Sequence, residues 1–338
     1  EIYVIAPTAG LSSSAQEESS ADGSQSRPFR SVHAAQAAMR AGLGEGQPRT
    51  VHVEGTHFLE RPLVLDARDA ATHDAPVTWQ SRSKDAPAHL TGGKQVPTSA
   101  FGAATVPSGA NGVVKANLFT ALGLSSADLG GMTNPYPFAD MELYVDGQPM
   151  TRARSPNIVQ DGTSHGHWMW AGYSNVTGVT DMTFDFADST MAELWAPATK
   201  SDTGLWLHGF FKFDWRDTFI KIDSIAPNAN HSYTVTRSPL TPPQYPFTNG
   251  CRFYAVAALE LLDVPGEYHI NNKTGDLHFL PLKPMTSETN VMVSVLNTVV
   301  EAGADHHSFK DMTISVARAG PAFTTVANGT TVGTHVTV

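Results

Sequence analysis

The sequence predicts an all-β protein organised around a parallel β-solenoid, and three observations lead to this prediction. A pattern of short alternating strands recurs at a period in the twenties between residues 50 and 96. One amphipathic helix precedes it, and the pattern returns after residue 290. Gly 28 and Pro 22, together with many Val and Thr residues, also favour short strands and turns.

Residues 1–49 are expected to form a strand, a polar loop and a capping helix. Glu1–Ile5 alternates like an edge strand, and Pro28-Phe29 opens a helix that ends before Gly42. An end rung of a solenoid exposes apolar side chains and unpaired backbone groups. We therefore expect this helix to cover the first rung.

Residues 50–96 are expected to form the first rungs. Val51-His52-Val53 recurs as Val77-Thr78-Trp79 after 26 residues, and Leu63 recurs as Leu90 after 27 residues. One rung cannot bury its inward side chains alone, so further rungs must stack on these two.

Residues 97–290 lack this period and are expected to form an inserted β-rich, sandwich-like module. Strand-like runs are separated by turn residues at 142–145, 219–222 and 232–236, and 266–280 forms a β-hairpin. Helical pieces are predicted near 118–124 and 254–262.

Residues 291–338 are expected to resume the rungs, starting with the alternation of Val291, Val293 and Val295. Met312 and Val336 repeat the pattern 24 residues apart. Because the last strand has no capping element after it, we expect the native chain to continue beyond Val338.

The composition limits the class of partner. Lys+Arg 22 against Asp+Glu 32 gives a net charge of −10 without a basic block, which argues against nucleic acid and anionic membranes and favours a glycan. No apolar run is long enough to cross a bilayer. Sequons at four asparagines are compatible with a secreted, extracellular or periplasmic glycoprotein, and these are Asn175, Asn230, Asn272 and Asn328.

Several motifs resemble a known family. EIYVIAPTAG, DGSQSRPFRSVHAAQAAMRAG and the rungs ending LTGG resemble the N-terminal part of the right-handed parallel β-helix proteins of the pectin-lyase-like superfamily. ELYVDGQPMTRARSPN, GLWLHGFFKFDWRDTFIKIDSI and RFYAVAALELLDVPGEYHINNKTGDLHFLPL resemble glycoside hydrolase family 141 and its relatives. This resemblance implies a right-handed parallel β-helix and a glycosidase, with fucosidase and xylanase activities known in the family. It also implies that the acidic catalytic residues lie on later rungs, so no catalytic residue is transferred to this chain.

Glycoside hydrolysis needs two carboxyl groups on either side of the scissile bond. Asp214 and Asp217 flank Trp215 in FKFDWRD, where the ring could stack on a sugar while the acids bind hydroxyls. The favoured alternative is an ordinary strand end, in which Asp217 starts a turn and Asp214 pairs with Arg216. Glu260 is a further acidic candidate, three residues before Asp263, for which a surface or capping role is the stronger interpretation.

Substrate binding is assigned provisionally to aromatic, basic and histidine side chains of the insertion. Arg152 and Arg154 point the same way from a predicted strand and could grip a sugar hydroxyl or carboxylate. The favoured alternative is that they tie the insertion to the β-helix through backbone carbonyls. For each tryptophan, a place in the core competes with a sugar-stacking role. The candidates of this class are Arg152, Arg154, Trp206, His208 and Trp215.

No cofactor is predicted, except that calcium would be expected for a lyase. His165 and His167 have the spacing of a strand-borne metal pair but lack a third ligand, and His306-His307 is no better. Cys251 is the only cysteine and is expected to be a buried apolar residue.

Three functions remain open. The first is hydrolysis of a glycosidic bond in a plant, algal or other extracellular polysaccharide by paired carboxylates. The second is a uronate lyase on the same solenoid, and the third is a non-catalytic glycan-binding or adhesion protein.

Overall fold

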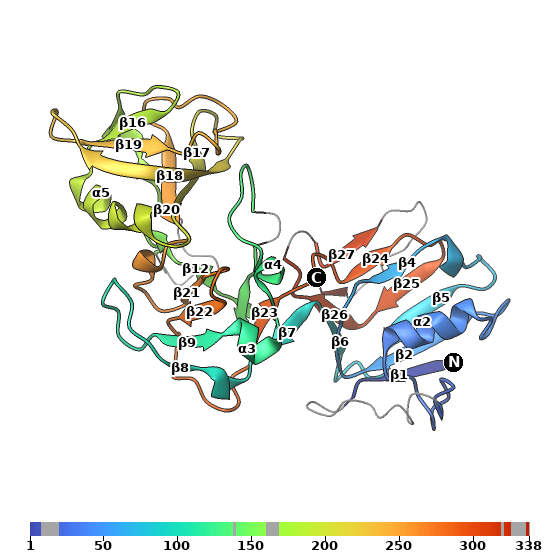
Figure 1. Ribbon diagram of the computed structural model, residues 1–338. Coiled ribbons are helices and arrows are strands. Elements are labelled where there is room, and N and C mark those ends of the chain that lie inside the picture. Colours follow the sequence, from blue (N-terminus) through green and yellow to red (C-terminus); the bar gives the residue numbers. More distant parts are fainter. Residues whose placement is uncertain (8–19, 138–139, 160–168, 319–320, 326–335, 338) are drawn as a thin grey trace. The chain divides into compact units, whose positions relative to one another are not determined.

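A computed structural model describes residues 1–7, 20–137, 140–159, 169–318, 321–325 and 336–337. The chain divides into two compact units, Glu1–Lys94 with Ser294–Val338 and Gln95–Val293 (Figure 1). Strands dominate both units, which confirms the all-β class.

The first unit contains three parallel sheets around one core. Their orders are β1-β2-β5-β25, β27-β24-β4 and β28-β26-β6-β3. The strands are β1 (Ile2–Ile5), β2 (Arg49–Glu54), β3 (Thr56–Phe58), β4 (Leu63–Leu65), β5 (Val77–Ser81), β6 (Ala88–Thr91), β24 (Val300–Ala302), β25 (His307–Lys310), β26 (Met312–Ser315), β27 (Phe323–Thr325) and β28 (Val336–Thr337). A short strand β7 (Gly93–Gln95) follows β6.

Alternate side chains of these strands form the core. Val51, Trp79 and Phe309 occupy matched positions on β2, β5 and β25, and each is fully buried. The rings of Trp79 and Phe309 stack with centroids 6.1 Å apart. Stacking of equivalent residues is what lets one strand bury the apolar face of the next.

The strand register differs from the prediction. Val51 pairs with Trp79 and not with Val77, so the offset along this sheet is two residues longer than expected. Leu63 pairs with Val300, whereas Leu90 pairs with His57 and Ile314 in another sheet. The predicted 24-residue offset is confirmed, because Met312 pairs with Val336. A two-residue shift keeps every side chain on the same face, and alternation alone therefore could not detect it.

Helix α2 (Val32–Arg40) lies beside these sheets in the first unit, and the 3₁₀ turn η1 (Ala67–Asp69) follows β4 (Figure 1). The helix starts later than predicted, because Ser31 caps it by accepting a hydrogen bond from the Ala34 N–H. Phe29 is extended and bridges Val4 instead. Val32, Ala35 and Met39 belong to the same core as the strands, so the helix covers part of it.

The second unit has an eight-stranded antiparallel sheet of order β13-β20-β17-β18-β19-β16-β15, in which β14 also pairs with β20. Its strands are β13 (Arg154–Ser155), β14 (Ala171–Gly172), β15 (Val176–Thr177), β16 (Thr183–Phe186), β17 (Leu205–Phe210), β18 (Thr218–Pro227), β19 (Tyr233–Arg237) and β20 (Arg252–Val256). Its short helices are η3 (Tyr173–Asn175), α5 (Ser189–Trp195), η4 (Pro197–Lys200) and η5 (Leu259–Leu261). One face buries a large aromatic core that includes Phe186, Trp195 and Phe253.

Two smaller groups of strands complete this unit. The sheet β12-β21-β22-β9-β8 is antiparallel except where β12 and β21 run parallel, and β10 pairs with β11 and β23. The elements are η2 (Thr98–Ala100), β8 (Gly102–Ala103), β9 (Val114–Asn117), α3 (Leu118–Leu122), α4 (Ser126–Leu129), β10 (Leu143–Val145), β11 (Gln148–Pro149), β12 (Thr151–Arg152), β21 (Glu267–Ile270), β22 (Asp276–Phe279) and β23 (Val291–Ser294). The hairpin predicted at 266–280 is confirmed as β21 and β22.

Two element predictions are wrong in this unit. Tyr254–Leu262 was expected to be helical, but Arg252–Val256 is strand β20 and only Leu259–Leu261 forms a 3₁₀ turn. The stretch from Val291 was expected to be a rung, but β23 pairs antiparallel with β10. In both cases partners distant in the sequence decide the conformation.

Candidate functional site

The face of the eight-stranded sheet that points away from the aromatic core carries the candidate site. Along β17, Leu205 and Leu207 are in the core, so the residues between and after them face outward. Cross-strand register places outward residues of β18 and β20 beside them. This outer face consists of Trp206, His208, Phe210, Phe219, Lys221, Arg252, Tyr254 and Val256.

His208 is the centre of a hydrogen-bonded network on the outer face. Its Nε2 lies 2.6 Å from Asp217 Oδ2, and its Nδ1 lies 2.7 Å from the Tyr254 hydroxyl. The imidazole also stacks on Phe219 with ring centroids 3.9 Å apart. The Tyr136 hydroxyl donates to the Asp217 backbone carbonyl at 3.0 Å. Two residues singled out from the sequence, His208 and Asp217, are therefore direct partners.

Burial favours the neutral form of His208 at the centre of this network. Loss of hydration lowers the pKa of His208, although the neighbouring Asp217 carboxylate partly opposes the shift. Burial raises the pKa of Tyr254 to about 12. At neutral pH the Tyr254 hydroxyl therefore donates to a neutral imidazole, whose N–H donates to Asp217.

Arg154 is part of the scaffold of the outer face. It is 1% exposed, its Nε donates to the Pro156 carbonyl at 2.9 Å, and its Nη2 donates to the Met169 carbonyl at 2.6 Å. Its guanidinium lies 3.5 Å from the centre of the Tyr254 ring. The partners are backbone carbonyls, as expected, but both belong to the insertion itself, so these bonds do not tie it to the predicted β-helix.

A pocket of about 210 Å³ opens beside Trp206 in the second unit. Its charged lining residues are Asp140, Arg152, Asp202, Lys221 and Lys273. Arg152 forms an ion pair with Asp140 and donates to the Met141 carbonyl at 3.0 Å.

The other three charges of this pocket are uncompensated. In the described part of the chain, Asp202, Lys221 and Lys273 form no ion pair with another side chain. Gly204 leaves room for Lys221, because a Cβ there would lie 2.8 Å from the lysine Cε. Asp202 and Lys221 were missed in the sequence because S-D-T-G resembles an ordinary turn and Lys221 an ordinary outward strand residue.

The sequons differ in accessibility. Asn230 is exposed in the turn between β18 and β19. Asn272 lines the pocket, and its Nδ2, the atom that carries an N-linked glycan, donates to the Gly130 carbonyl at 2.6 Å. Asn175 ends η3 and is half-buried. Asn328 lies outside the described residues.

The acidic candidates do not converge. Asp214 is 83% exposed and pairs with Arg252 at 3.4 Å, whereas Asp217 is held by His208 and Tyr136. Glu260 lies in η5 with a buried, unpaired Oε2, and it does not line the pocket.

Trp215 lies in the turn between β17 and β18 and is 69% exposed. Its ring stacks on Phe213, with centroids 5.2 Å apart, and contacts the edge of Tyr245. We call these three residues the Trp215 platform.

The metal and thiol candidates give no site. His165 and His167 lie outside the described residues, and among those described no group of three or more His, Cys, Asp or Glu side chains could hold a metal ion. His307 is buried in the first unit, where its Nε2 lies 2.8 Å from the Asp69 carbonyl. Cys251 is buried, which raises the pKa of its thiol to about 12.

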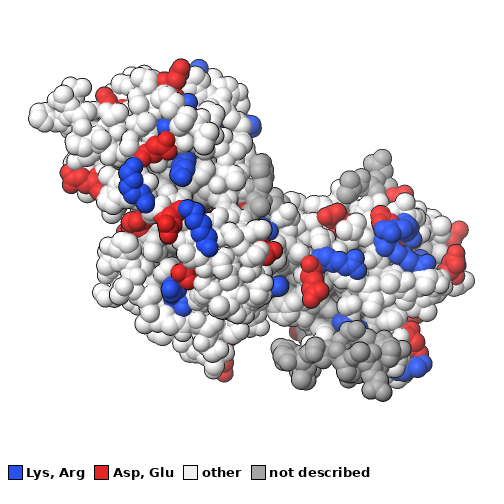
Figure 2. All heavy atoms as spheres, in the orientation of Figure 1, with Lys and Arg blue, Asp and Glu red and all other residues white. Residues whose placement is uncertain are grey.

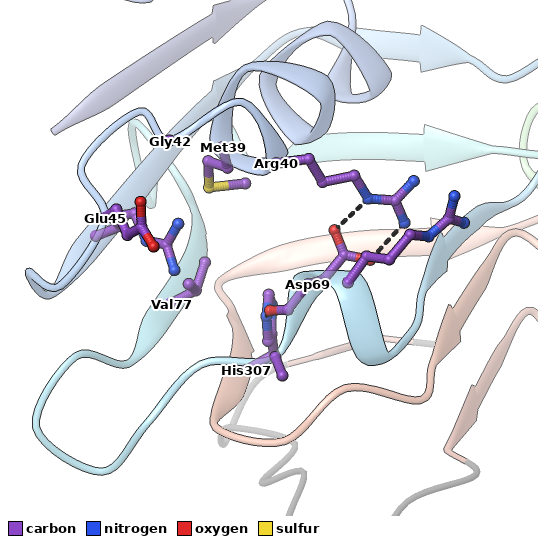
Figure 3. Close-up of a pocket in the computed structure, with 10 residues that line it drawn as sticks. Met39, Arg40, Gly42, Glu45, Asp69, Val77 and His307 are labelled. Atoms are coloured by element: carbon purple, nitrogen blue, oxygen red, sulfur yellow. Dashed lines mark hydrogen bonds and ion pairs between the residues drawn. The ribbon is translucent and has the colours of Figure 1, made fainter.

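A second pocket, of about 150 Å³, lies in the first unit between the end of α2 and β5 (Figure 3). Its most prominent contact is the ion pair between Arg40 and Asp69, whose two hydrogen bonds measure 2.6 and 2.8 Å. Because this pair fixes the helix to η1, we interpret the pocket as part of the cap.

The surface charge follows the composition. On the face drawn in Figure 2, basic and acidic side chains are interspersed within each unit and no extended basic patch appears. None of the described helices is long and apolar enough to span a membrane.

Comparison with known proteins gives a likeness in structure but not in sequence. No protein-family model matches the chain, and no curated protein matches it. A solved structure named "Glycoside hydrolase" superposes with a TM-score of 0.67 at 17% identity, covering 94% of this chain and 50% of that one. The chain shares the fold of that protein. It spans about half of that protein's length.

A second solved structure, "The complex structure of XylC with xylose", aligns over 95% of this chain and 36% of that one at 9% identity. Its TM-score of 0.36 is too low to establish a common fold.

Proposed function

We propose that this chain is part of a carbohydrate-active protein of the glycoside hydrolase type, and that the pocket beside Trp206 holds a sugar unit of its substrate. The observation that carries the proposal is the juxtaposition in that pocket of Trp206 with Asp202 and Lys221, neither of which has an ion-pair partner among the described residues. Trp206 is only 6% exposed and gives the pocket an apolar wall, whereas charged groups that form no ion pair can bind sugar hydroxyls. The fold shared with a glycoside hydrolase is consistent with this proposal.

The finer fold assignment belongs to the same proposal. The first unit would be the start of a right-handed parallel β-helix resembling that of glycoside hydrolase family 141. Its support is that successive strands β2, β3 and β4 enter three different parallel sheets, as the turns of a coil do. Crossovers between parallel strands are almost always right-handed.

Catalysis would follow the paired-carboxylate mechanism. The acids of the pocket are Asp140, which Arg152 neutralises, and Asp202. One unpaired carboxylate does not make the pair that hydrolysis needs. We therefore propose a binding role for this pocket, with Trp206 and Arg152 in its wall, and assign the catalytic pair to no described residue.

A uronate lyase remains the second candidate because of one feature of the pocket. Lys221 and Lys273 form no ion pair with any described residue, and the two cations could hold the carboxylate of a uronic acid.

A substrate screen separates these functions. The protein is incubated with neutral polysaccharides (xylan, β-glucan, mannan, fucan) and with uronans (polygalacturonate, alginate). Release of reducing ends without ultraviolet absorption supports hydrolysis, whereas an unsaturated product that absorbs supports the lyase. Binding without turnover supports a glycan-binding protein, and absence of both binding and turnover with every polymer contradicts the proposal.

Substitution of Lys221 tests the pocket itself. Lys221→Met keeps the apolar stem but removes the charge, so we expect the affinity for the bound polysaccharide to fall about tenfold, the equivalent of one charged hydrogen bond. Affinity electrophoresis measures the change. Lys310→Met, at an exposed lysine of the first unit, is the matched control and should bind like the wild type. Equal affinities of the wild type, Lys221→Met and Lys310→Met would show that the pocket does not bind the polysaccharide.

A further inference from the structure

The Trp215 platform is an exposed aromatic surface that the folded chain holds in a fixed geometry. Phe213 and Trp215 are nearly parallel, with an interplanar angle of 13°, and Tyr245 packs edge-on against both rings. Lys212 lies over the Phe213 ring, 5.2 Å from its centre. With Phe213 stacked against one face of the indole and most of Trp215 still exposed, a flat apolar surface remains open to solvent.

Polar side chains surround this surface and are themselves fixed. Arg216 hydrogen-bonds to Gln244, and its guanidinium lies 5.8 Å from the centre of the Tyr136 ring. Asp214 pairs with Arg252, which lies over Phe210. An apolar plate with hydrogen-bonding groups at its rim matches a pyranose ring, which presents C–H groups on its faces and hydroxyls at its edge.

The platform lies at a distance from the pocket but belongs to the same face. Arg252 and Phe210 are outer-face residues, so the Asp214–Arg252 pair connects the platform to that face. Trp206, in the pocket wall, and Phe210, at the platform end of β17, are four residues apart. At about 3.3 Å per residue this corresponds to about 13 Å, which exceeds the span of a single sugar ring.

We propose that the Trp215 platform is a second saccharide-binding subsite, so that the protein binds an oligomeric stretch of polysaccharide through the pocket and the platform together. This inference rests on the proposed function. Two linked contacts raise the affinity for a long chain above that for either contact alone, because the second contact forms within an already bound molecule. A short ligand in the pocket gains nothing from the platform.

The experiment compares ligand lengths in wild-type protein and in Trp215→Ala. The probes are xylohexaose, cellohexaose and mannohexaose, each paired with its monosaccharide, and the polysaccharides of the screen above. Isothermal titration calorimetry and affinity electrophoresis give the affinities. We expect Trp215→Ala to lower the affinity for hexasaccharide or polymer about tenfold and to leave that for the monosaccharide unchanged. Trp215→Phe should retain part of the affinity.

Leu282→Ala is the matched control, because Leu282 is 67% exposed and distant in sequence from the platform. It should bind every probe like the wild type. Unchanged polymer affinity in Trp215→Ala, with Lys221→Met still impaired, overturns the second subsite and leaves the proposed function intact. A change in oligomeric state by light scattering without a change in saccharide affinity also overturns it, because the platform would then contact protein. If the wild type binds no saccharide at all, the proposed function fails first.

Discussion

His208 shows how much of the candidate site can be predicted residue by residue from the sequence. The sequence singled out both His208 and Asp217, but nothing in it indicated that they would meet 2.6 Å apart. Tyr254 was assigned to a helix, so its hydrogen bond to His208 could not be predicted. For Arg154 and Trp215 the sequence left a structural and a sugar-binding alternative open. Arg154 is 1% exposed and bonded to backbone carbonyls, and Trp215 is 69% exposed and lies outside the core. Their roles in binding stay predictions.

Removal of the Tyr254 hydroxyl tests the network at this scale. Tyr254→Phe leaves His208 Nδ1 without its partner in a poorly hydrated place, so we expect the free energy of unfolding to fall by about 1–3 kcal/mol. Urea denaturation followed by tryptophan fluorescence measures it. Tyr245→Phe is the control, because its hydroxyl has no hydrogen-bond partner among the described residues. Equal effects of the two substitutions would show that the network adds no stability.

At the scale of elements, local patterns identified fewer than half of the described strands and failed where partners distant in the sequence decide the conformation. The β21–β22 hairpin could be predicted because both strands and the turn between them lie within one short stretch of sequence. The segment from Tyr254 was assigned to a helix because Ala and Leu are common there. It forms a strand because β17 and β13 lie on either side of it and offer backbone hydrogen bonds.

Gly209 shows how closely β17 and β20 approach. A Cβ at this position would lie 2.4 Å from the Arg252 carbonyl oxygen and 2.5 Å from the Phe253 Cβ. We expect Gly209→Ala to lower the unfolding free energy by about 1–3 kcal/mol, because the strands must separate to admit the methyl group. Thermal unfolding by circular dichroism measures the loss. Gly102→Ala, in β8, is the control, since no atom lies within 4 Å of its added Cβ. A similar Tm for both variants would contradict this packing.

At the scale of the whole molecule, the buried histidines determine the response to acid. Burial lowers the pKa of His57 in the first unit to about 4 and that of His269 in the second unit to about 3. In the unfolded chain a histidine takes up a proton near pH 6.5, so the unfolded state binds more protons below that pH. Stability is therefore fully present above pH 6.5 and is lost as the pH falls towards the folded-state pKa. Glu267 has the opposite effect on the pH dependence of stability. Burial raises its pKa to about 8, so the fold favours its neutral form and its contribution to stability is lost as the pH rises.

His57→Gln tests this in the first unit. Between pH 7 and pH 4.5 the wild type should lose about 2–3 kcal/mol of unfolding free energy through His57 alone, and the variant should lose correspondingly less. Urea titrations at the two pH values give the difference. His73→Gln, at an exposed histidine, should keep the wild-type slope. The prediction is wrong if His57→Gln and the wild type lose the same stability.

The pairing of β5 with β25 has a consequence for biosynthesis. Val77 and His307 are neighbours in one sheet, yet the ribosome must make all of residues 95–293 before β25 exists. At about 5–20 residues per second this interval lasts roughly 10–40 s. The second unit is continuous in sequence and can fold as it emerges, whereas the edge of β5 stays without its partner β25. Slow translation across residues 95–293 would therefore prolong the time for which the edge of β5 stays unpaired.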